Sequence, residues 1–239
     1  MNSSFFDYRY ITKKQADYLT NISQKHQFTY FEIPKTGCST IKKTLQTIEN
    51  EGIETPKELV HDKSSSPLKG FLDLDLKQKT LEKLFSFTIV RNPYDRILST
   101  YLDKIVTNLW EKKRRVGSLG FKFEEDISFL NFLKAIEKQD PLDMDIHWKP
   151  QSYLLPKDLS IFNYIGKFET FENDWNIILN KIKNTSLNTN EKIFQSRDVI
   201  FHKTNANEKK ISYYGKEEIA LVQRIYALDF EKLNYTKGI

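Results

Sequence analysis

The stretch FTYFEIPKTGCSTIKKTLQTIEN, residues 28–50, contains the strand, loop and helix that decide the predicted fold. Phe28 to Ile33 is rich in aromatic and β-branched side chains, which favours a strand. From Thr40 to Asn50 the apolar side chains recur at helical spacing, at Ile41, Leu45 and Ile48. The stretch therefore predicts a buried strand followed, after a short loop, by an amphipathic helix.

Two further strand–helix units follow along the chain. Phe85 to Val90 (FSFTIV) is a nearly continuous apolar run, as expected for a strand buried on both faces. Asn92 and Pro93 suit the N-cap and first turn of the next helix, whose apolar face comprises Tyr94, Ile97, Leu98, Tyr101, Leu102 and Ile105. Tyr164 to Phe168 (YIGKF) precedes a third helix, which runs through Trp175, Ile178, Leu179 and Ile182.

Strands that alternate with helices predict an α/β fold, with a central parallel sheet between two layers of helices. The length of 239 residues suits one domain over residues 1–239. Ligands of such sheets bind beyond the carboxyl ends of the strands. The loops after the first two predicted strands are therefore the places to look for a site.

The composition indicates a folded chain with anionic partners. Hydrophobic residues make up 39% and charged residues 29%, and the formal net charge is +5, which favours nucleotides, acidic glycans, nucleic acid or membrane surfaces. The densest basic run, Lys112 to Arg115, is more typical of a solvated helix face than of a site. No apolar stretch reaches the roughly 18 residues that a membrane span needs.

The single cysteine excludes an intramolecular disulfide. We therefore expect a cytosolic protein; a Golgi lumenal domain trimmed of its membrane anchor is the alternative.

The loop Pro34 to Thr40 has the features of an anion cradle. Gly37 lets the backbone approach a ligand closely, and the amides at a helix N-terminus point at it. Lys35 adds a charge, and Ser39 and Thr40 add hydroxyl donors. The triphosphate-binding pattern GxxxxGK[ST] is absent, and the alternative is a simple glycine turn with a solvent-facing lysine. The candidate ligand-binding residues here are Lys35, Thr36, Gly37, Cys38, Ser39 and Thr40.

Cys38 is also a candidate nucleophile, since a helix N-terminus lowers the pKa of a thiol. A phosphatase-type nucleophile needs an arginine a few residues on, whereas Ile41, Lys42 and Lys43 follow here. We therefore do not favour that reading.

A second candidate anion site follows the strand Phe85 to Val90. Arg91 leaves its carboxyl end and is suited to a forked pair of bonds to a phosphate, and Ser99 is placed to donate from the next helix. Arg96 is either a third contact or a surface arginine. Two such sites suit a ligand with phosphates at both ends of a nucleoside.

Together these segments resemble the family of 3′-phosphoadenosine-5′-phosphosulfate (PAPS)-dependent carbohydrate sulfotransferases that includes the chondroitin 4-O- and heparan 2-O-enzymes. The resemblance lies in IPKTGCST (33–40), FTIVRNPYDRILSTYLDK (87–104), FKFEEDISFLNFL (121–133), HWKPQSYL (147–154), YIGKFETFENDW (164–175) and IYALDFEKLNY (225–235). It implies a P-loop-like fold, PAPS as donor, adenosine 3′,5′-bisphosphate as product, a carbohydrate hydroxyl as acceptor and no metal. One departure is Leu155, where the animal chondroitin-type enzymes tend to carry a cysteine, and its absence suits a cytosolic protein without disulfides. The helix after the first loop also lacks the family's frequent tryptophan, which leaves the acceptor open.

The resemblance implies in-line displacement at sulfur, with Lys35 stabilising charge on the bridging oxygen. A general base is then needed, and histidine suits that task at neutral pH. By resemblance the base lies between the two anion motifs, which favours His61; His147 is the second candidate, and Glu32 and Asp62 are further alternatives. We expect His26 at the surface and His202 in a segment that closes over the nucleotide.

Two other functions remain open from the sequence. A nucleotide-dependent kinase would need a magnesium-binding carboxylate, and Asp73 and Asp75 do not end a convincing strand. A non-catalytic binder of acidic glycan or nucleic acid would use the basic surface, but basic residues interleaved with aromatic ones are not obvious. We therefore expect no nucleic-acid partner, and the sequence does not indicate an oligomeric state.

Overall fold

The computed structural model describes residues 5–72, 83–186 and 212–239. Backbone contacts divide the chain into two compact units. Unit 1 comprises Met1–Val90 and Leu154–Phe201, and unit 2 comprises Arg91–Tyr153 and His202–Ile239. The expectation of a single domain stays a prediction.

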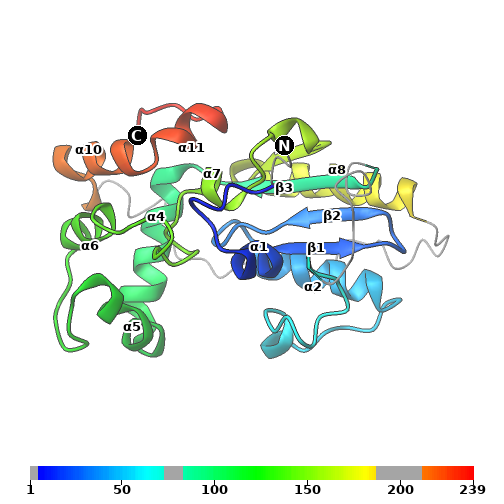
Figure 1. Cartoon of the computed structure of the whole chain (residues 1–239), viewed down its shortest axis with the longest axis horizontal. Helices are drawn as coiled ribbons and strands as arrows, with labels where there is room; N and C mark the ends of the chain where they lie inside the picture. The colour runs from blue at the N-terminus through cyan, green and yellow to red at the C-terminus, as the bar shows by residue number, and fades with distance from the viewer. Residues whose placement is uncertain (1–4, 73–82, 187–211) are drawn as a thin grey trace. The chain divides into compact units, whose positions relative to one another are not determined.

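Unit 1 is built on a four-stranded sheet of order β1-β2-β3-β4 (Figure 1). The pairs β2–β3 and β3–β4 are parallel, with Phe28 opposite Phe85 and Phe87 opposite Tyr164, whereas β1 pairs antiparallel with β2. Its elements are α1 (Lys13–Leu19), β1 (Thr20–Ser23), β2 (Phe28–Phe31), α2 (Cys38–Glu49), η1 (Lys57–Leu59), β3 (Phe85–Val90), η4 (Leu159–Ile161), β4 (Tyr164–Lys167), η5 (Phe168–Thr170) and α8 (Phe171–Thr185).

One face of this sheet carries the main core of unit 1. Alternate side chains of β2 and β3, among them Phe28, Tyr30 and Phe87, pack in one cluster with α2 and α8. On β2 the next side chain, Phe31, points to the opposite face, where its ring contacts Phe162 with centroids 5.2 Å apart. The N-terminal segment covers the same place, since the Phe5 ring stacks on Phe31 at 5.9 Å.

The predicted α/β class and the mainly parallel sheet are confirmed. The three predicted strands lie within a residue or two of the observed ones, and β3 spans the residues predicted for it. The antiparallel edge strand β1 is an addition that the periodicity does not predict. Within unit 1, α2 and α8 pack into the same core cluster rather than on opposite faces of the sheet.

Unit 2 is helical in its described part. Its elements are α4 (Pro93–Tyr101), η2 (Leu102–Thr107), α5 (Leu109–Arg115), η3 (Val116–Leu119), α6 (Phe129–Glu137), α7 (Gln151–Leu154, whose last residue falls in unit 1), α10 (Lys216–Ile225) and α11 (Ala227–Lys232). The predicted start of α4 is confirmed: the Asn92 side chain accepts from the amide of Tyr94 at 3.0 Å, and Pro93 is the first helical residue. Beyond Tyr101 the helix continues as a π-helical stretch, η2.

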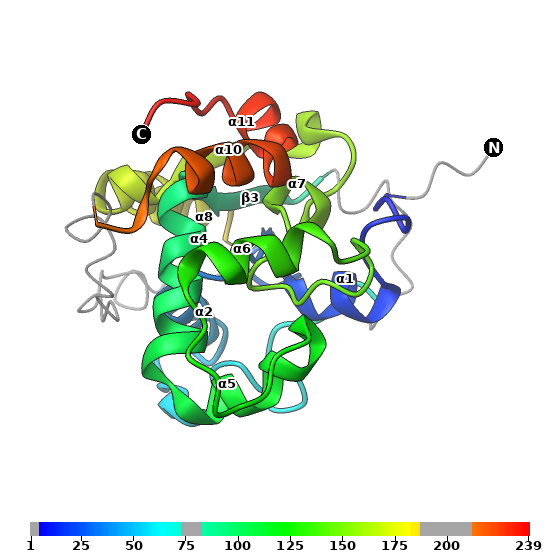
Figure 2. The same ribbon diagram turned by 90° about the vertical axis from the view of Figure 1, so that its left-hand side faces the viewer.

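The core of unit 2 forms where α4, α6 and α10 meet, and Figure 2 shows α6 beside both other helices. The Trp148 ring meets Phe132 edge-on at 5.8 Å, and the Tyr226 hydroxyl donates to the Trp148 carbonyl at 2.7 Å. Within the described ranges, no helix combines the length and the apolar character that crossing a bilayer requires.

The junction of β4 with α8 depends on the buried carboxylate of Asp174. Its Oδ2 accepts from the amide of Lys167 at 2.7 Å and from the hydroxyl of Thr170 at 2.8 Å, and its Oδ1 accepts from the hydroxyl of Tyr164 at 2.8 Å. Desolvation favours the neutral acid, but these bonds outweigh it and lower the pKa of Asp174. The ionised carboxylate therefore stabilises this junction.

Replacing Asp174 by asparagine removes the charge while keeping the shape. We expect Asp174→Asn to lower the free energy of unfolding at pH 7 by about 1.5–3 kcal/mol, the usual worth of hydrogen bonds to a charged group. A lowered pKa means that this stabilisation is present above the unfolded pKa of about 3.9 and is lost as the pH falls toward the folded value. Urea unfolding between pH 7 and pH 3.5 measures it. Glu172→Gln, at an exposed position of the same helix, is the control. If the loss of unfolding free energy in Asp174→Asn does not depend on pH, the ionised carboxylate is not what stabilises the junction.

Candidate functional site

The loop that joins β2 to α2 has an unusual backbone. Lys35 has a φ of +72° and Gly37 a φ of +82°, and a non-glycine residue in this left-handed region typically stores of order 1–3 kcal/mol of strain. Gly37 is also the N-cap of α2, and no side chain caps the helix there. A helix that begins uncapped behind a glycine is the arrangement that binds anions.

Packing on one side fixes the loop in this conformation. A Cβ on Gly37 would lie 2.9 Å from Cε2 of Phe171 and 3.3 Å from Cε2 of Phe168, so a larger residue does not fit. The buried hydroxyl of Thr36 donates to the carbonyl of Ile33 at 2.8 Å and closes the turn. Thr40 is buried in the first turn of α2. The loop is therefore preformed.

His61 lies beside this loop, as the sequence predicts for the base. Its Nε2 is 2.8 Å from the Ser39 hydroxyl, and its Nδ1 is 3.6 Å from Oε1 of Glu32. The backbone around it is held to the neighbouring helices, since Tyr18 donates to the His61 carbonyl at 3.2 Å and Gln46 donates to the Val60 carbonyl at 3.1 Å. The ring is 42% exposed, so it is fixed in place and still open to solvent.

A buried ion pair lies behind the ring. Lys42 Nζ is 3.1 Å from Oε2 of Glu32, and the two side chains are 1% and 2% exposed. Desolvation works to raise the pKa of Glu32, but the charge of Lys42 and the contact with His61 outweigh it and lower this pKa to about 2. The sequence analysis names Glu32 only as an alternative base and does not single out Lys42. A carboxylate ending an apolar strand is the signal that points to the pair.

Asp62, the other alternative base, is engaged in its own turn. Its carboxylate accepts from the Ser64 amide at 3.0 Å and from the Ser65 hydroxyl at 2.6 Å. This geometry does not bring it to the loop, and no described contact joins it to the His61 ring.

The environment of Cys38 opposes a nucleophilic role. The residue is partly exposed, but desolvation of the thiol, together with the nearby charge of Glu32, raises its pKa to about 12. The helix N-terminus would act in the opposite direction, and here it does not prevail. The thiol therefore stays protonated at neutral pH.

Arg91 and Ser99, the second predicted anion site, belong to unit 2. Gln151 holds the Arg91 backbone from both sides, accepting from its amide at 2.9 Å and donating to its carbonyl at 2.8 Å. Gln151 is anchored in turn, because the buried carboxylate of Asp229 accepts from its amide at 2.8 Å. Ser99 is buried in α4. This clamp joins the sequence blocks 147–154 and 225–235, but the roles of Arg91 and Ser99 as ligand contacts stay predictions.

The Arg96 side chain is buried rather than solvent-facing. It is 1% exposed and donates to the carbonyls of Lys149 at 2.8 Å and Ile146 at 3.0 Å. The alternative of a surface arginine is therefore wrong. The guanidinium can be buried here because its several N–H donors bond two carbonyls at once.

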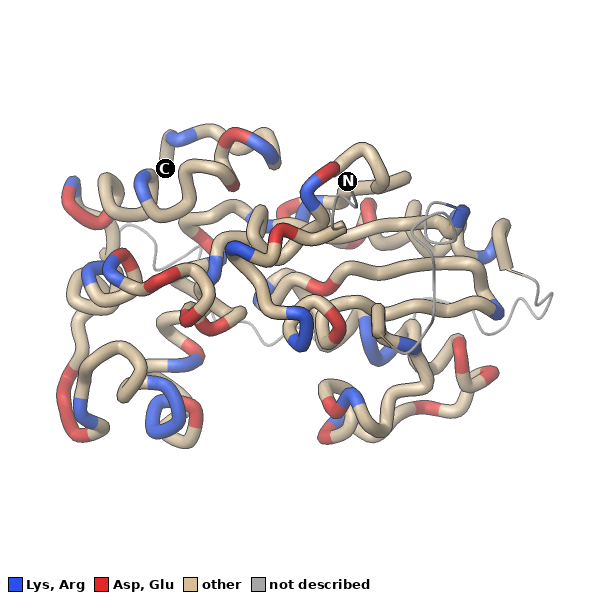
Figure 3. The backbone as a smooth tube through the Cα atoms, in the orientation of Figure 1, with Lys and Arg blue, Asp and Glu red and all other residues tan. Residues whose placement is uncertain are grey.

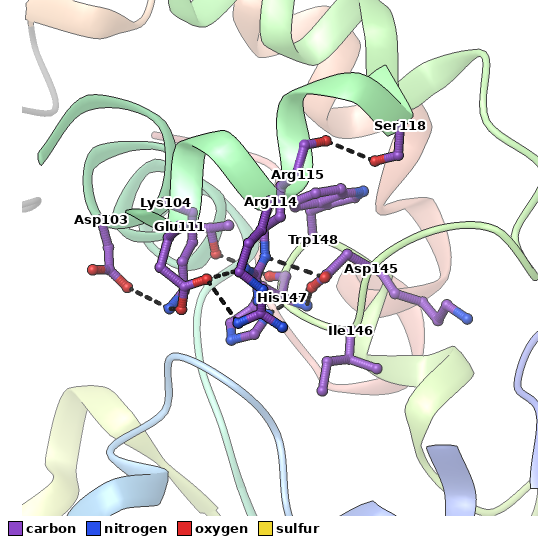
Figure 4. A network of polar contacts seen from close by, with 12 residues as sticks. Asp103, Lys104, Glu111, Arg114, Arg115, Ser118, Asp145, Ile146, His147 and Trp148 are labelled. Atoms are coloured by element: carbon purple, nitrogen blue, oxygen red, sulfur yellow. Dashed lines mark hydrogen bonds and ion pairs between the residues drawn. The ribbon is translucent and has the colours of Figure 1, made fainter. Parts of the chain in front are cut away.

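His147, the second candidate base, sits in a polar network within unit 2 (Figure 4). Its Nδ1 lies 2.6 Å from Asp145, whose other oxygen is 3.2 Å from Nε of Arg115. Arg115 also pairs with Glu111, which Lys104 contacts at 2.8 Å. Desolvation lowers the pKa of His147 despite the contact with Asp145, so the imidazole is neutral near pH 7. Its catalytic role stays a prediction.

The basic run Lys112 to Arg115 is not a simple solvated face. Figure 3 shows it as a continuous basic stretch in α5, but Arg115 is buried in the network of Figure 4. Lys112 donates to the Glu125 carbonyl at 2.7 Å, and the Arg114 guanidinium stacks 4.4 Å from the centre of the Trp110 ring. Three of the four cations thus have partners within unit 2.

His26 is not at the surface, contrary to expectation. It is fully buried, with Nδ1 2.7 Å from the Ser186 hydroxyl, and desolvation lowers its pKa. Its partner is 160 residues away in sequence, which is why the local sequence misleads. His202, Asp73 and Asp75 lie outside the described residues. Among the residues that the structure does describe, no three histidine, cysteine or carboxylate side chains gather as a metal site would need.

Comparison of the sequence with known proteins identifies the family to which the chain belongs. A family described as "Sulfotransferase family" matches residues 18–236. Carbohydrate sulfotransferase 8 of Homo sapiens is 27% identical over 245 residues, 90% of this chain and 55% of that protein, and human carbohydrate sulfotransferase 9 is 28% identical over 240 residues, with shares of 90% and 52%. Carbohydrate sulfotransferase 10 of Pongo abelii is 30% identical over 189 residues, with shares of 66% and 51%.

The chain thus spans about half the length of these curated relatives. No solved structure shows a significant match to it.

The raised pKa of Cys38 predicts how its thiol reacts. We expect alkylation by iodoacetamide at pH 8 to be at least about tenfold slower than for an unfolded thiol of pKa 8.5, because only the thiolate reacts. The rate should keep rising beyond pH 9, where an ordinary thiol levels off. Mass spectrometry of the only cysteine in native and urea-unfolded protein measures both rates. Fast native alkylation at pH 7 would restore the nucleophilic reading.

Proposed function

Because the chain belongs to the sulfotransferase family, we propose that it transfers a sulfuryl group from PAPS to a hydroxyl of a carbohydrate. The observation that carries the proposal is the 2.8 Å contact between Nε2 of His61 and the Ser39 hydroxyl. It sets a general base against an anion-binding loop, which is the pairing that sulfuryl transfer to a hydroxyl needs. The names of the relatives, all carbohydrate sulfotransferases, support a carbohydrate acceptor.

The loop residues bind the donor's phosphosulfate group in this proposal. The amides that begin α2 at Cys38 and the Ser39 and Thr40 hydroxyls donate to its oxygens, and Gly37 allows the close approach. The strained backbone of Lys35 is explained if its ammonium must point at one atom, the oxygen that bridges phosphorus and sulfur. Arg91 and Ser99 bind the 3′-phosphate, Arg91 with the forked geometry that suits phosphate.

The reaction then needs little covalent chemistry from the protein. The acceptor oxygen forms a bond to sulfur while the bond from sulfur to the bridging oxygen breaks, and adenosine 3′,5′-bisphosphate leaves. His61 Nε2 takes the proton of the acceptor hydroxyl, and Lys35 stabilises the charge on the departing oxygen. Positioning supplies most of the acceleration.

His61 is a better base than His147 on the geometry of each unit. His61 presents Nε2 to the loop and is 42% exposed, whereas His147 is 20% exposed and tied through Nδ1 to a network of ion pairs. We therefore assign the base to His61 and expect His147 to hold the segment between α6 and α7.

Ligand-dependent unfolding tests the proposed donor. We expect adenosine 3′,5′-bisphosphate to raise the apparent stability by about 2.7 kcal/mol at a hundredfold excess over Kd, since it binds only the folded state. Arg91→Ala should lose most of this gain. Thermal unfolding with the bisphosphate, with ATP and with ATP plus magnesium measures it. A shift with ATP and magnesium alone would identify a kinase and overturn the proposal.

Measurements of turnover and of bisphosphate binding distinguish the proposed role of Lys35 in the loop from that of His61 as the base. We expect Lys35→Ala to abolish measurable transfer, and His61→Gln to lower kcat by about 10²–10⁴-fold while leaving the Kd for the bisphosphate within about threefold, because the ring acts on the acceptor. His147→Gln is the matched comparison and should retain most of the kcat. Release of bisphosphate from PAPS with a panel of carbohydrate acceptors measures turnover. If His147→Gln loses turnover and His61→Gln keeps it, the two assignments exchange.

A further inference from the structure

His61 has a carboxylate behind it that the proposed reaction does not yet use. Glu32 follows the last residue of β2, so the sheet fixes its backbone, and its amide donates to the Leu19 carbonyl at 2.7 Å. One of its oxygens faces Nδ1 of His61 at 3.6 Å and the other faces Nζ of Lys42 at 3.1 Å. The order along this chain of contacts is Lys42, Glu32, His61, Ser39.

We infer that Glu32 is a positioning residue for His61, and that Lys42 is the counter-ion that holds its carboxylate in place. This rests on the proposed function, in which His61 is the base. A carboxylate at Nδ1 makes that nitrogen the donor and leaves the lone pair on Nε2. The Nε2 atom is the one that faces the loop, so the pair sets both the tautomer and the direction of the ring.

The burial of the pair argues for a function beyond stability. Two charges taken out of water lose much of their hydration, and replacing a buried ion pair by apolar residues is often neutral or stabilising. Glu32 and Lys42 are nevertheless both at least 98% buried. The neighbouring pair formed by Lys43 of the same helix and Glu54 has a similar separation, 2.9 Å, but its side chains are 34% and 53% exposed. The Glu32–Lys42 pair therefore differs from the Lys43–Glu54 pair in its burial, and its carboxylate contacts His61.

The contact of 3.6 Å is longer than a normal hydrogen bond. Catalytic hydrogen bonds in proteins without substrate are often long and tighten in the reacting complex. When His61 takes the acceptor proton it becomes a cation, and the buried carboxylate at its other nitrogen attracts that cation more strongly than the same carboxylate would in bulk water. Glu32 thus favours the state that the reaction must reach.

The other titratable groups around the ring do not compete for this role. Burial raises the pKa of the Tyr18 phenol and of the Cys38 thiol, so both are neutral at physiological pH. Asp62, next in the chain, is bonded to Ser64 and Ser65. Glu32 contacts the ring at 3.6 Å, and Lys42 contacts the carboxylate of Glu32 at 3.1 Å.

The test removes the pair as a whole. Glu32→Gln alone would leave Lys42 buried without a counter-charge and could unfold the protein, so the variant is Glu32→Gln with Lys42→Met. We expect the Kd for adenosine 3′,5′-bisphosphate to stay within about threefold and kcat to fall by about tenfold or more. Glu54→Gln with Lys43→Met, the exposed pair, is the matched control and should change none of these.

Two further measurements separate this inference from the proposed function. The same double substitution placed in a His61→Gln background should cause no further loss of kcat, because Glu32 acts through His61. The tautomer of the deprotonated His61 ring, read from its ¹⁵N chemical shifts and assigned by their absence in His61→Gln, should have the proton on Nδ1 in the unmodified protein and in the control, and should lose that preference in the double variant. That measurement needs no turnover, so it decides the Glu32–His61 contact even if the chain neither binds the bisphosphate nor transfers a sulfuryl group. An unchanged tautomer in the double variant, or a further loss of kcat in the His61→Gln background, overturns the inference.

Discussion

The parallel pairing of β2 with β3 is the constraint from which the rest of the site in unit 1 follows. Two parallel strands cannot be joined by a tight turn, so the chain must cross over the sheet before it returns. The crossover begins with the loop of Lys35 and Gly37, continues through α2, and carries η1 and His61 before β3 starts. The amides proposed to bind the phosphosulfate group and the proposed base are thus parts of one connection within unit 1.

Charge is distributed differently in the two units. At the end of β2 the buried carboxylate of Glu32 is shared by the buried Lys42 and by the partly exposed ring of His61. In unit 2 the network of Figure 4 runs from Lys104 through Glu111, Arg115 and Asp145 to His147. Its cations and anions alternate, so most of the polar groups are satisfied by one another. The first arrangement directs Nε2 of His61 toward the loop at Ser39, whereas the second joins α5 to the segment that carries His147.

The sequence predicted the features that depend on local chemistry. The apolar run of β3 and the Asn92–Pro93 start of α4 were both recovered, because burial on two faces and helix capping leave their mark on adjacent residues. The buried charged groups were not predicted. His26 was expected at the surface, Arg96 was left as either a ligand contact or a surface residue, and Lys42 was not singled out. The partners of Lys42, Arg96 and His26 lie ten, about fifty and 160 residues away. The short edge strand β1 (TNIS) lacks an apolar pattern although every residue in it is buried. The roles of the loop residues, of Arg91 and of both histidines stay predictions, as does the cytosolic location, because they concern molecules and surroundings beyond the chain.

The contact of Gly37 with Phe168 and Phe171 makes the loop and the start of α8 a matched pair, although more than 130 positions separate them in the sequence. A chimera that imports residues 34–40 from a relative, without the aromatic residues of its own η5 and α8, would set a foreign loop against rings shaped for another one. Transplantation of a loop that carries a side chain at position 37 therefore has to move both segments together.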